Sequence, residues 1–150
     1  MTIILDMGGV LMQHNMPECI RRFCEMLGEE GMANTLGMKV NAEGLPDSLM
    51  EKFECGLVTT EEFVHTILAN AKEGTTEQQI IDAWNTMHAG IPLERIKQIK
   101  RWKKLGHHLL LLSNNNALHW EDIHAHYDMS IFDQCFASHL VHSHKPNKPI

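Results

Sequence analysis

The first ten residues, MTIILDMGGV, constrain the fold more than any other stretch of this sequence. Thr2 to Leu5 are β-branched or aliphatic and precede a glycine pair, a pattern typical of a buried strand in a parallel sheet. Asp6 follows this strand, and Gly8 and Gly9 allow the backbone to turn sharply. Because ligands of open α/β sheets bind beyond the carboxyl ends of the strands, Asp6 is a candidate nucleophile. An isolated aspartate more often caps a turn, so the later motifs decide between the two roles.

Composition and charge exclude several classes of protein. The formal net charge of −6 argues against a nucleic-acid partner, which requires a basic surface. No apolar stretch approaches the length needed to span a bilayer, and the amino terminus lacks the basic region and cleavage site of a signal peptide. The four cysteines show no CxxC spacing and fit free thiols in a reducing compartment. We therefore expect a cytoplasmic protein without a membrane or nucleic-acid partner; its oligomeric state stays open.

Residues 15–88 carry a helical pattern without a strand signal. Pro17 marks the start of a first helix with Ile20 on its apolar side, and Gly28 is its predicted stop. Two capping boxes predict the starts of later helices, Thr59 with Glu62 and Thr75 with Gln78. Amphipathic helices bury their apolar faces against one another or against another layer. The sequence therefore predicts a helical-bundle cap inserted over residues 15–88.

Beyond Gly90, helices and strands alternate. The predicted elements are helices at 92–106 and 117–127 and strands at 108–112 and 135–138. Such alternation gives a parallel sheet with right-handed crossovers. The predicted fold class is therefore α/β, with a Rossmann-like three-layer α/β/α core built from residues 1–14 and 89–150.

Polar side chains follow each predicted strand. Asp6 follows the first strand, Ser113 and Asn114 follow the second, and Lys145 comes shortly after the third. Together they supply a nucleophile, a hydroxyl and an amide donor, and a cation. Transfer of an anionic group to a carboxylate needs these groups, because the cation and donors hold the charge that develops on the transferred group.

At these motifs the chain resembles the haloacid dehalogenase-like (HAD) hydrolase superfamily, in the branch with a helical cap after the first strand. Ile3 to Val10 looks like its first motif, Leu112-Ser113-Asn114 like its second, and Lys145-Pro146 like its third. The stretch FECG at 53–56 and the stretch WNTM at 84–87 are similar to those of a phosphatase-like subgroup. The resemblance covers essentially the whole chain.

The resemblance implies a role for each strand-end residue. Asp6 would be the catalytic nucleophile that becomes an aspartyl-phosphate, and Ser113 and Lys145 would bind the phosphoryl oxygens. Asn114 is a further candidate for substrate contact. Mg²⁺ would bridge Asp6 and the substrate, with the backbone carbonyl of Gly8 as another ligand. The expected activity is that of a Mg²⁺-dependent phosphatase acting on a small phosphorylated metabolite.

The sequence departs from the superfamily pattern in two places. Gly8 stands where phosphatases of the superfamily usually carry a second aspartate, the general acid and base. His14 is the nearest replacement along the chain. The fourth motif, which supplies further acidic ligands for Mg²⁺, should follow Lys145 at some distance, but the sequence ends at Ile150. We therefore expect a core that is incomplete at its carboxyl end and binds Mg²⁺ weakly.

Two other functions stay open on the sequence. A 2-haloacid dehalogenase uses the same nucleophile without Mg²⁺ and lacks the second aspartate, but usually has a cap arginine, for which Arg21 and Arg22 are the candidates. A catalytically silent scaffold with this fold would account for Gly8 and for the missing fourth motif.

The eleven histidines raise the separate question of a transition-metal site. The pairs His124/His126 and His142/His144 are candidates, but two residues of a helix that are two positions apart point to different faces. Surface or partly buried imidazoles are the simpler interpretation. His119, close to the polar turn after the second strand, is a candidate either for the active cleft or for a structural role.

Overall fold

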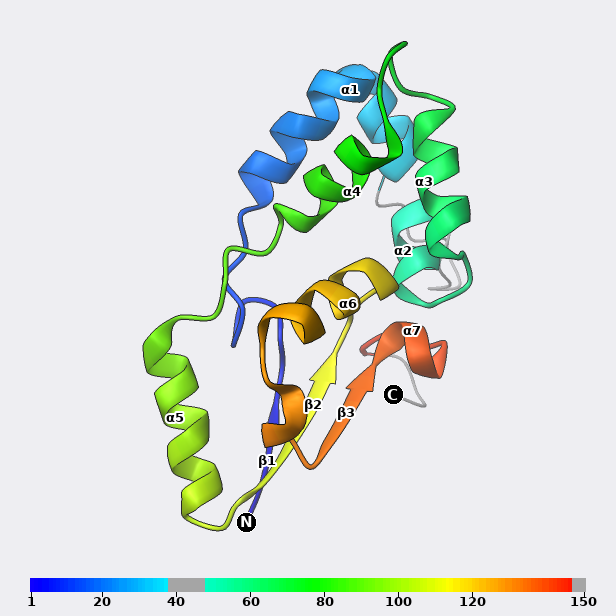
Figure 1. The fold of residues 1–150 in the computed structure, drawn as a ribbon. Coiled ribbons are helices and arrows are strands. Elements are labelled where there is room, and N and C mark those ends of the chain that lie inside the picture. Colours follow the sequence, from blue (N-terminus) through cyan, green and yellow to red (C-terminus); the bar gives the residue numbers. More distant parts are fainter. Residues whose placement is uncertain (38–47, 147–150) are drawn as a thin grey trace.

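The computed structural model describes residues 1–37 and 48–146, and it divides into a lower α/β layer and an upper layer of helices (Figure 1). The segments 38–47 of the predicted cap and 147–150 of the predicted core lie outside the described residues. The elements in chain order are β1 (Thr2–Leu5), α1 (Met16–Leu36), α2 (Leu49–Glu54), α3 (Thr60–Leu68), α4 (Glu77–Asn85), α5 (Leu93–Lys104), β2 (His108–Ser113), α6 (Ala117–His126), η1 (Met129–Ile131), β3 (Gln134–Ala137) and α7 (Ser138–Val141).

The lower layer is a parallel three-stranded sheet in the order β1-β2-β3, flanked by helices. Leu5 pairs with Leu111, and Ser113 pairs with Ala137, so the strands end at one edge of the sheet. Leu109 and Leu111 are fully buried, whereas the alternate leucines of β2 are half-buried. The parallel α/β fold predicted from the sequence is confirmed, with one face of β2 more deeply covered than the other.

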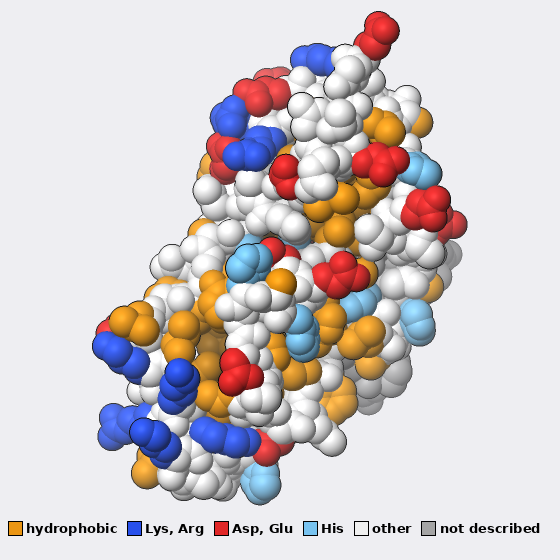
Figure 2. Space-filling model, in the orientation of Figure 1, with side chains coloured by type: hydrophobic (Ala, Val, Ile, Leu, Met, Phe, Trp, Pro, Cys, Tyr) orange, Lys and Arg blue, Asp and Glu red, His pale blue; other side chains and the backbone are white. Residues whose placement is uncertain are grey.

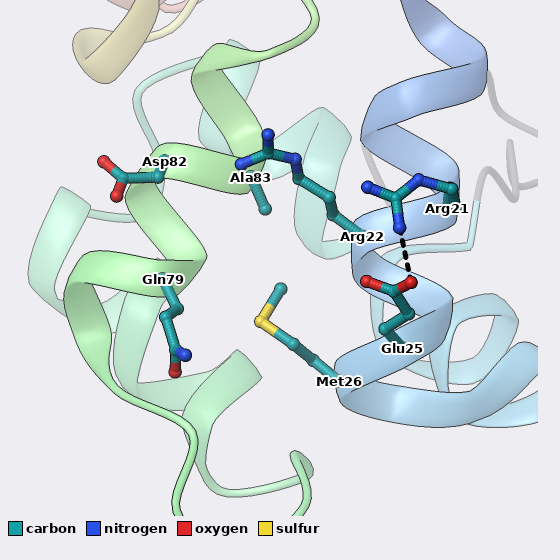
Figure 3. A pocket seen from close by; sticks show the side chains of 7 residues that line it. All are labelled: Arg21, Arg22, Glu25, Met26, Gln79, Asp82 and Ala83. Carbon is teal, nitrogen blue, oxygen red and sulfur yellow. Dashed lines mark hydrogen bonds and ion pairs between the residues drawn. The ribbon is translucent and has the colours of Figure 1, made fainter.

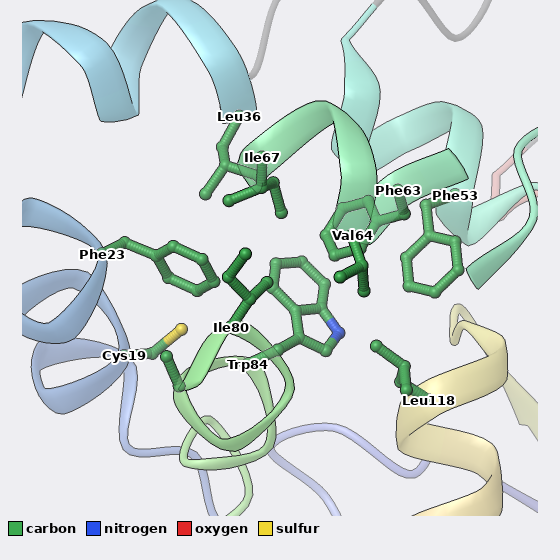
Figure 4. Packing of buried hydrophobic residues seen from close by; sticks show 11 residues of the cluster. Cys19, Phe23, Leu36, Phe53, Phe63, Val64, Ile67, Ile80, Trp84 and Leu118 are labelled. Atoms are coloured by element: carbon green, nitrogen blue, oxygen red, sulfur yellow. The ribbon is translucent and has the colours of Figure 1, made fainter. Parts of the chain in front are cut away.

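Helices α1 to α4 pack around Trp84 in the upper layer (Figure 4). The ring centroid of Trp84 lies 4.9 Å from that of Phe63 and 6.1 Å from that of Phe23. Leu118 of α6 belongs to the same buried cluster, although α6 follows β2 in the chain. The helical pattern of the predicted cap is therefore observed, and its apolar core extends into the α/β layer. The division into two domains stays a prediction.

The upper helices differ from the sequence expectations in three details. The helix that begins at Met16 kinks at Gly28 (φ 75°, ψ 164°) and resumes to Leu36, because glycine tolerates the positive φ that breaks the helix there. Ile20, expected on the apolar side, is 43% exposed. The capping box of α4 uses Thr76 and Gln79, one residue later than expected, because adjacent threonines and adjacent glutamines allow both frames.

Ser138 starts a short helix instead of ending the third strand. β3 runs from Gln134 to Ala137, and α7 begins directly after it.

The capping box predicted at Thr59 and Glu62 is observed at the start of α3. No helix in residues 1–37 and 48–146 is both long and apolar enough to cross a membrane.

Candidate active site

The carboxyl end of the sheet brings Asp6 and Lys145 together. Lys145 Nζ lies 2.8 Å from Asp6 Oδ2, and the two side chains are 29% and 40% exposed. Asp6 follows β1, whereas Lys145 lies beyond α7, near the other end of the chain. The structure thus brings together the carboxylate and the cation on which the sequence interpretation depends, and both remain partly open to solvent.

Asn114 holds the segment that carries Lys145. Its Oδ1 accepts a hydrogen bond from the Lys145 backbone N at 2.7 Å, and its Nδ2 donates to the Lys145 carbonyl at 3.2 Å. Lys145 Nζ also donates to the carbonyl of Leu112 at 3.0 Å. Both polar groups of the Asn114 side chain are therefore engaged with Lys145, which makes Asn114 a positioning residue in this arrangement.

Ser113 lies at the end of β2 and is almost fully buried. Its hydroxyl donates to the carbonyl of Asn114 at 3.1 Å. No hydrogen bond joins Ser113 to Asp6 or Lys145 in the described part of the chain. The sheet places Ser113 at the same edge as Asp6, but its hydroxyl must rotate to meet an anion there.

The turn after β1 fixes the other oxygen of Asp6. The backbone N of Met7 donates to Asp6 Oδ1 at 2.8 Å. The carbonyl of Met7 accepts hydrogen bonds from Leu11 N at 2.9 Å and from Met12 N at 2.8 Å. Gly9 has a φ of 72°, which favours glycine at this position. Each carboxylate oxygen of Asp6 thus has a partner, so the orientation of the carboxylate is set before any substrate binds.

No protein-family model and no curated protein sequence matches the chain. Solved structures do. A HAD family enzyme from Bacteroides thetaiotaomicron, in its magnesium complex, gives a TM-score of 0.80 at 24% identity over 97% of this chain and 71% of its own. The complex of the same enzyme with magnesium and inorganic phosphate gives a TM-score of 0.77 at 24% identity, over 96% of this chain and 71% of the enzyme. A predicted HAD-like family hydrolase from Porphyromonas gingivalis gives 0.78 at 27% identity over 97% and 70%.

The chain has the HAD-like hydrolase fold. The resemblance found in the three sequence motifs is therefore confirmed at the level of the fold. Asp6 and Lys145, which carry the first and third motifs, are also the two residues that meet at 2.8 Å.

Gly8, the position where a HAD phosphatase usually carries its second aspartate, is covered by His14. A Cβ atom added to Gly8 would lie 2.8 Å from Cε1 and 2.9 Å from Nε2 of His14. The imidazole of His14 is exposed and stacks on that of His88, with ring centroids 6.4 Å apart. His14 therefore occupies the space into which a side chain at position 8 would project.

Arg21 and Arg22, the candidates for a dehalogenase carboxylate site, lie in a different place. Figure 3 shows them beside a cavity of about 240 Å³ between α1 and α4. Arg21 pairs with Glu18 and Glu25, and Arg22 pairs with Glu18. Asp6 is absent from the lining of this cavity. Because both guanidinium groups are already paired with carboxylates, the structure gives the dehalogenase hypothesis no support.

His119 is structural. It is buried, and its Nε2 donates to the carbonyl of Trp84 at 3.0 Å. Its Nδ1 lies 3.1 Å from Asn116 Nδ2 and accepts a hydrogen bond from it. Burial lowers the pKa of His119 to about 3, so the imidazole stays neutral. Of the two roles considered for His119, the structure supports the structural one, which joins α4 to α6.

The paired histidines have protein partners of other kinds. His126 Nδ1 lies 2.8 Å from the Asp122 carbonyl, and His144 Nδ1 lies 3.2 Å from Cys55 Sγ. His142 Nδ1 lies 3.1 Å from the Cys55 carbonyl. Within residues 1–37 and 48–146, no group of three or more His, Cys, Asp or Glu is arranged to hold a metal ion.

The sequence interpretation missed the contact between α2 and the segment after β3. Ser138 is buried, accepts a hydrogen bond from Asn115 N at 2.8 Å, and donates to the carbonyl of Glu54. A Cβ atom on Gly56 would lie 2.2 Å from the His139 carbonyl oxygen, so only glycine fits there. The glycine of the FECG stretch was the available signal, because a glycine directly after a helix often marks a close backbone approach.

Glu54 is the other residue of interest at this junction. Burial, together with the neighbouring Glu51 carboxylate, raises the pKa of Glu54 to about 7. Its carboxyl forms no hydrogen bond or ion pair within the described residues. A carboxyl with a strongly raised pKa near a strand-end turn is typical of functional sites, although structural positions also produce such shifts.

Proposed function

We propose that this protein is a Mg²⁺-dependent phosphatase of a small phosphorylated metabolite that forms an aspartyl-phosphate on Asp6. The observation that carries the proposal is the contact of 2.8 Å between Lys145 Nζ and Asp6 Oδ2 at the carboxyl end of a parallel sheet. The magnesium and phosphate complex of the Bacteroides enzyme supports the same class of chemistry.

The mechanism follows from the groups at this edge of the sheet. An oxygen of Asp6 attacks phosphorus, the bond from phosphorus to the ester oxygen breaks, and the leaving oxygen takes up a proton. Water then attacks phosphorus, the acyl-phosphate bond breaks, and Asp6 is restored as inorganic phosphate leaves. Lys145 compensates the negative charge of the phosphoryl group in both steps. Asn114 keeps Lys145 in place through its two backbone hydrogen bonds.

The residues around Asp6 fit a weakly held Mg²⁺. The carbonyl of Gly8 accepts no hydrogen bond from the described residues, so it is available as a ligand beside the Asp6 carboxylate. Mg²⁺ in proteins is usually held by one or two carboxylates, substrate phosphates and several waters. Asp6 and Gly8 would hold the ion, which when bound would neutralise charge on the phosphoryl oxygens.

The first test is a panel of small phosphate esters assayed with Mg²⁺ and with EDTA. We expect release of inorganic phosphate that requires Mg²⁺ and saturates with substrate. Release of chloride from 2-chloropropionate in EDTA would instead indicate a dehalogenase. If no ester is turned over and beryllofluoride fails to bind at Asp6, the protein is a scaffold with this fold and the proposal is wrong.

The second test concerns His14, which we propose as the proton donor to the leaving oxygen in place of the missing aspartate. His14→Ala is expected to lower kcat about 100-fold, the usual contribution of a positioned acid-base group. His65→Ala is the matched control, because His65 is an exposed cap histidine paired with Glu77, and it should leave kcat unchanged. Equal kcat values for His14→Ala and the parent would exclude His14.

A double variant tests whether position 8 faces the leaving group. Gly8→Asp alone brings its Cβ within 2.9 Å of the His14 ring and forces that side chain to move. In the His14→Ala background the space is vacant, so Gly8→Asp should recover part of the lost kcat. Failure to recover, with the fold intact by circular dichroism, would show that position 8 does not face the leaving group.

A further inference from the structure

Helix α5 concentrates positive charge in a chain whose formal net charge is −6. Six of the 13 Lys and Arg residues of the chain belong to this helix: Arg95, Lys97, Lys100, Arg101, Lys103 and Lys104. Figure 2 shows blue side chains gathered on the lower side of the molecule, over α5, whereas acidic side chains predominate over the helices above. The protein is therefore strongly polarised along its length.

Within the described residues, three of these cations form no hydrogen bond or ion pair, although one of them, Lys100, interacts electrostatically with Asp128. Lys97 pairs with Glu94 at 2.8 Å, Lys103 pairs with Asp133 at 2.7 Å, and Arg95 donates to the Leu11 carbonyl. The others form no hydrogen bond or ion pair with the part of the chain that the structure describes; they are Lys100, Arg101 and Lys104. Residues three and four positions apart lie on the same side of a helix, so these three cations form one basic surface.

An apolar hollow lies directly beside this surface. Its volume is about 240 Å³, and it lies between α5, the end of α6 and η1. Its apolar lining includes Leu11, Ile96, Ile99, Met129, Ile131 and Phe132. Lys100, His126, Tyr127 and Asp128 contribute polar groups to the lining. Figure 2 shows the hollow between orange side chains, with blue side chains next to it.

The size and chemistry of the hollow decide what it fits. Small-molecule sites usually measure roughly 300–1,000 Å³, so this hollow is small for a metabolite. It is large enough to receive apolar side chains from another chain. Leu93 and Leu105, at the two ends of α5, are 62% and 63% exposed, which extends the apolar contact surface beyond the hollow.

We propose that α5 and this hollow form a docking surface for an acidic protein segment that inserts apolar side chains into the hollow. Amphipathic segments bind grooves through apolar anchors at helical spacing, and complementary charge sets their orientation and association rate. A membrane fits less well, because most aliphatic side chains of this surface are recessed in the hollow, where Asp128 lies among them. Nucleic acid fits less well, because the lining is aliphatic and Asp128 and Glu94 lie among the cations.

The test uses the whole chain and a synthetic amphipathic peptide, with Leu along one helical face and Glu on the other. We expect saturable binding of the peptide. In NMR spectra, changes in amide chemical shift should be confined to α5, η1 and the residues lining the hollow. The variant Lys100→Glu/Arg101→Glu/Lys104→Glu should bind the peptide at least about tenfold more weakly than the parent protein does. Added salt should also weaken binding of the peptide to the parent protein.

Three controls keep the proposal falsifiable. A peptide of the same composition with scrambled leucine positions should bind weakly. This control distinguishes insertion of apolar side chains from electrostatic attraction alone. Lys100→Arg/Lys104→Arg should retain binding, because these substitutions keep both positive charges. Equal binding of the peptide by the charge-reversed variant would overturn the proposal, as would preferential binding of phosphatidylserine vesicles or duplex DNA. Phosphatase activity should be unchanged in all these variants, since none of the substituted residues contacts Asp6.

Discussion

Asp6→Asn is expected to abolish phosphate-ester turnover, with kcat/KM lowered by more than about 1,000-fold, as for other enzymes that lose their nucleophile. The amide is neutral and cannot form an acyl-phosphate with phosphorus. It keeps the shape of the carboxylate and the oxygen that accepts from Met7 N. The loss should therefore appear in the rate and not in the fold, which steady-state kinetics and thermal unfolding would separate.

Asp82→Asn is the matched control for this substitution. Asp82 is an exposed carboxylate of α4 that accepts a hydrogen bond from Gln78, and it lies in the cap. Its removal should leave kcat/KM within a factor of two or so of the parent, as expected for a surface substitution. If Asp6→Asn kept the activity of the parent, or if beryllofluoride bound equally to both proteins, Asp6 would not be the nucleophile.

Glu54→Gln is expected to stabilise the protein at neutral and alkaline pH. Burial, and secondarily Glu51, raises the pKa of Glu54 from 4.5 to about 7 in the folded state. Between these values the folded state binds more protons than the unfolded state, so stability falls as the pH rises from about 4.5 to about 7. The full effect is roughly 3 kcal/mol at most, since each pKa unit corresponds to about 1.4 kcal/mol.

Urea unfolding at two pH values measures this effect directly. At about pH 8 the free energy of unfolding of Glu54→Gln should exceed that of the parent by about 2–3 kcal/mol. At or below about pH 4.5 this difference should vanish. Glu61→Gln, at an exposed position of α3, should change the free energy of unfolding by less than about 0.5 kcal/mol at either pH. Equal stability of parent and Glu54→Gln at about pH 8 would show that Glu54 is solvated.

The sequence predicted what depends on local pattern. An aliphatic run that ends in a polar residue marks a strand end wherever it occurs, so Asp6 and Ser113 could be placed at one edge of the sheet without coordinates. Lys145, at its distance along the chain from these two residues, completes the set of three motifs. The fold that the motifs imply is the fold observed.

Contacts between distant segments could not be predicted in this way. Nothing near Asn114 in the sequence shows that both ends of its side chain bind the Lys145 backbone. Its contact with a substrate stays a prediction. The imidazole of His14 reaches Gly8 only because the turn between them folds back. The phase of a helix is also weakly determined by a few apolar residues, which is why Ile20 was placed on the wrong side.

The hydrogen bond between Trp84 and Asn116 affects how cooperatively the protein unfolds. Trp84 Nε1 donates to Asn116 Oδ1 at 3.1 Å in a buried position, and Leu118 completes the apolar cluster around the same indole. Separating α4 from α6 would break this hydrogen bond and expose the indole ring to water. We therefore expect the upper helices and the sheet to unfold together, and heating should give a single calorimetric peak.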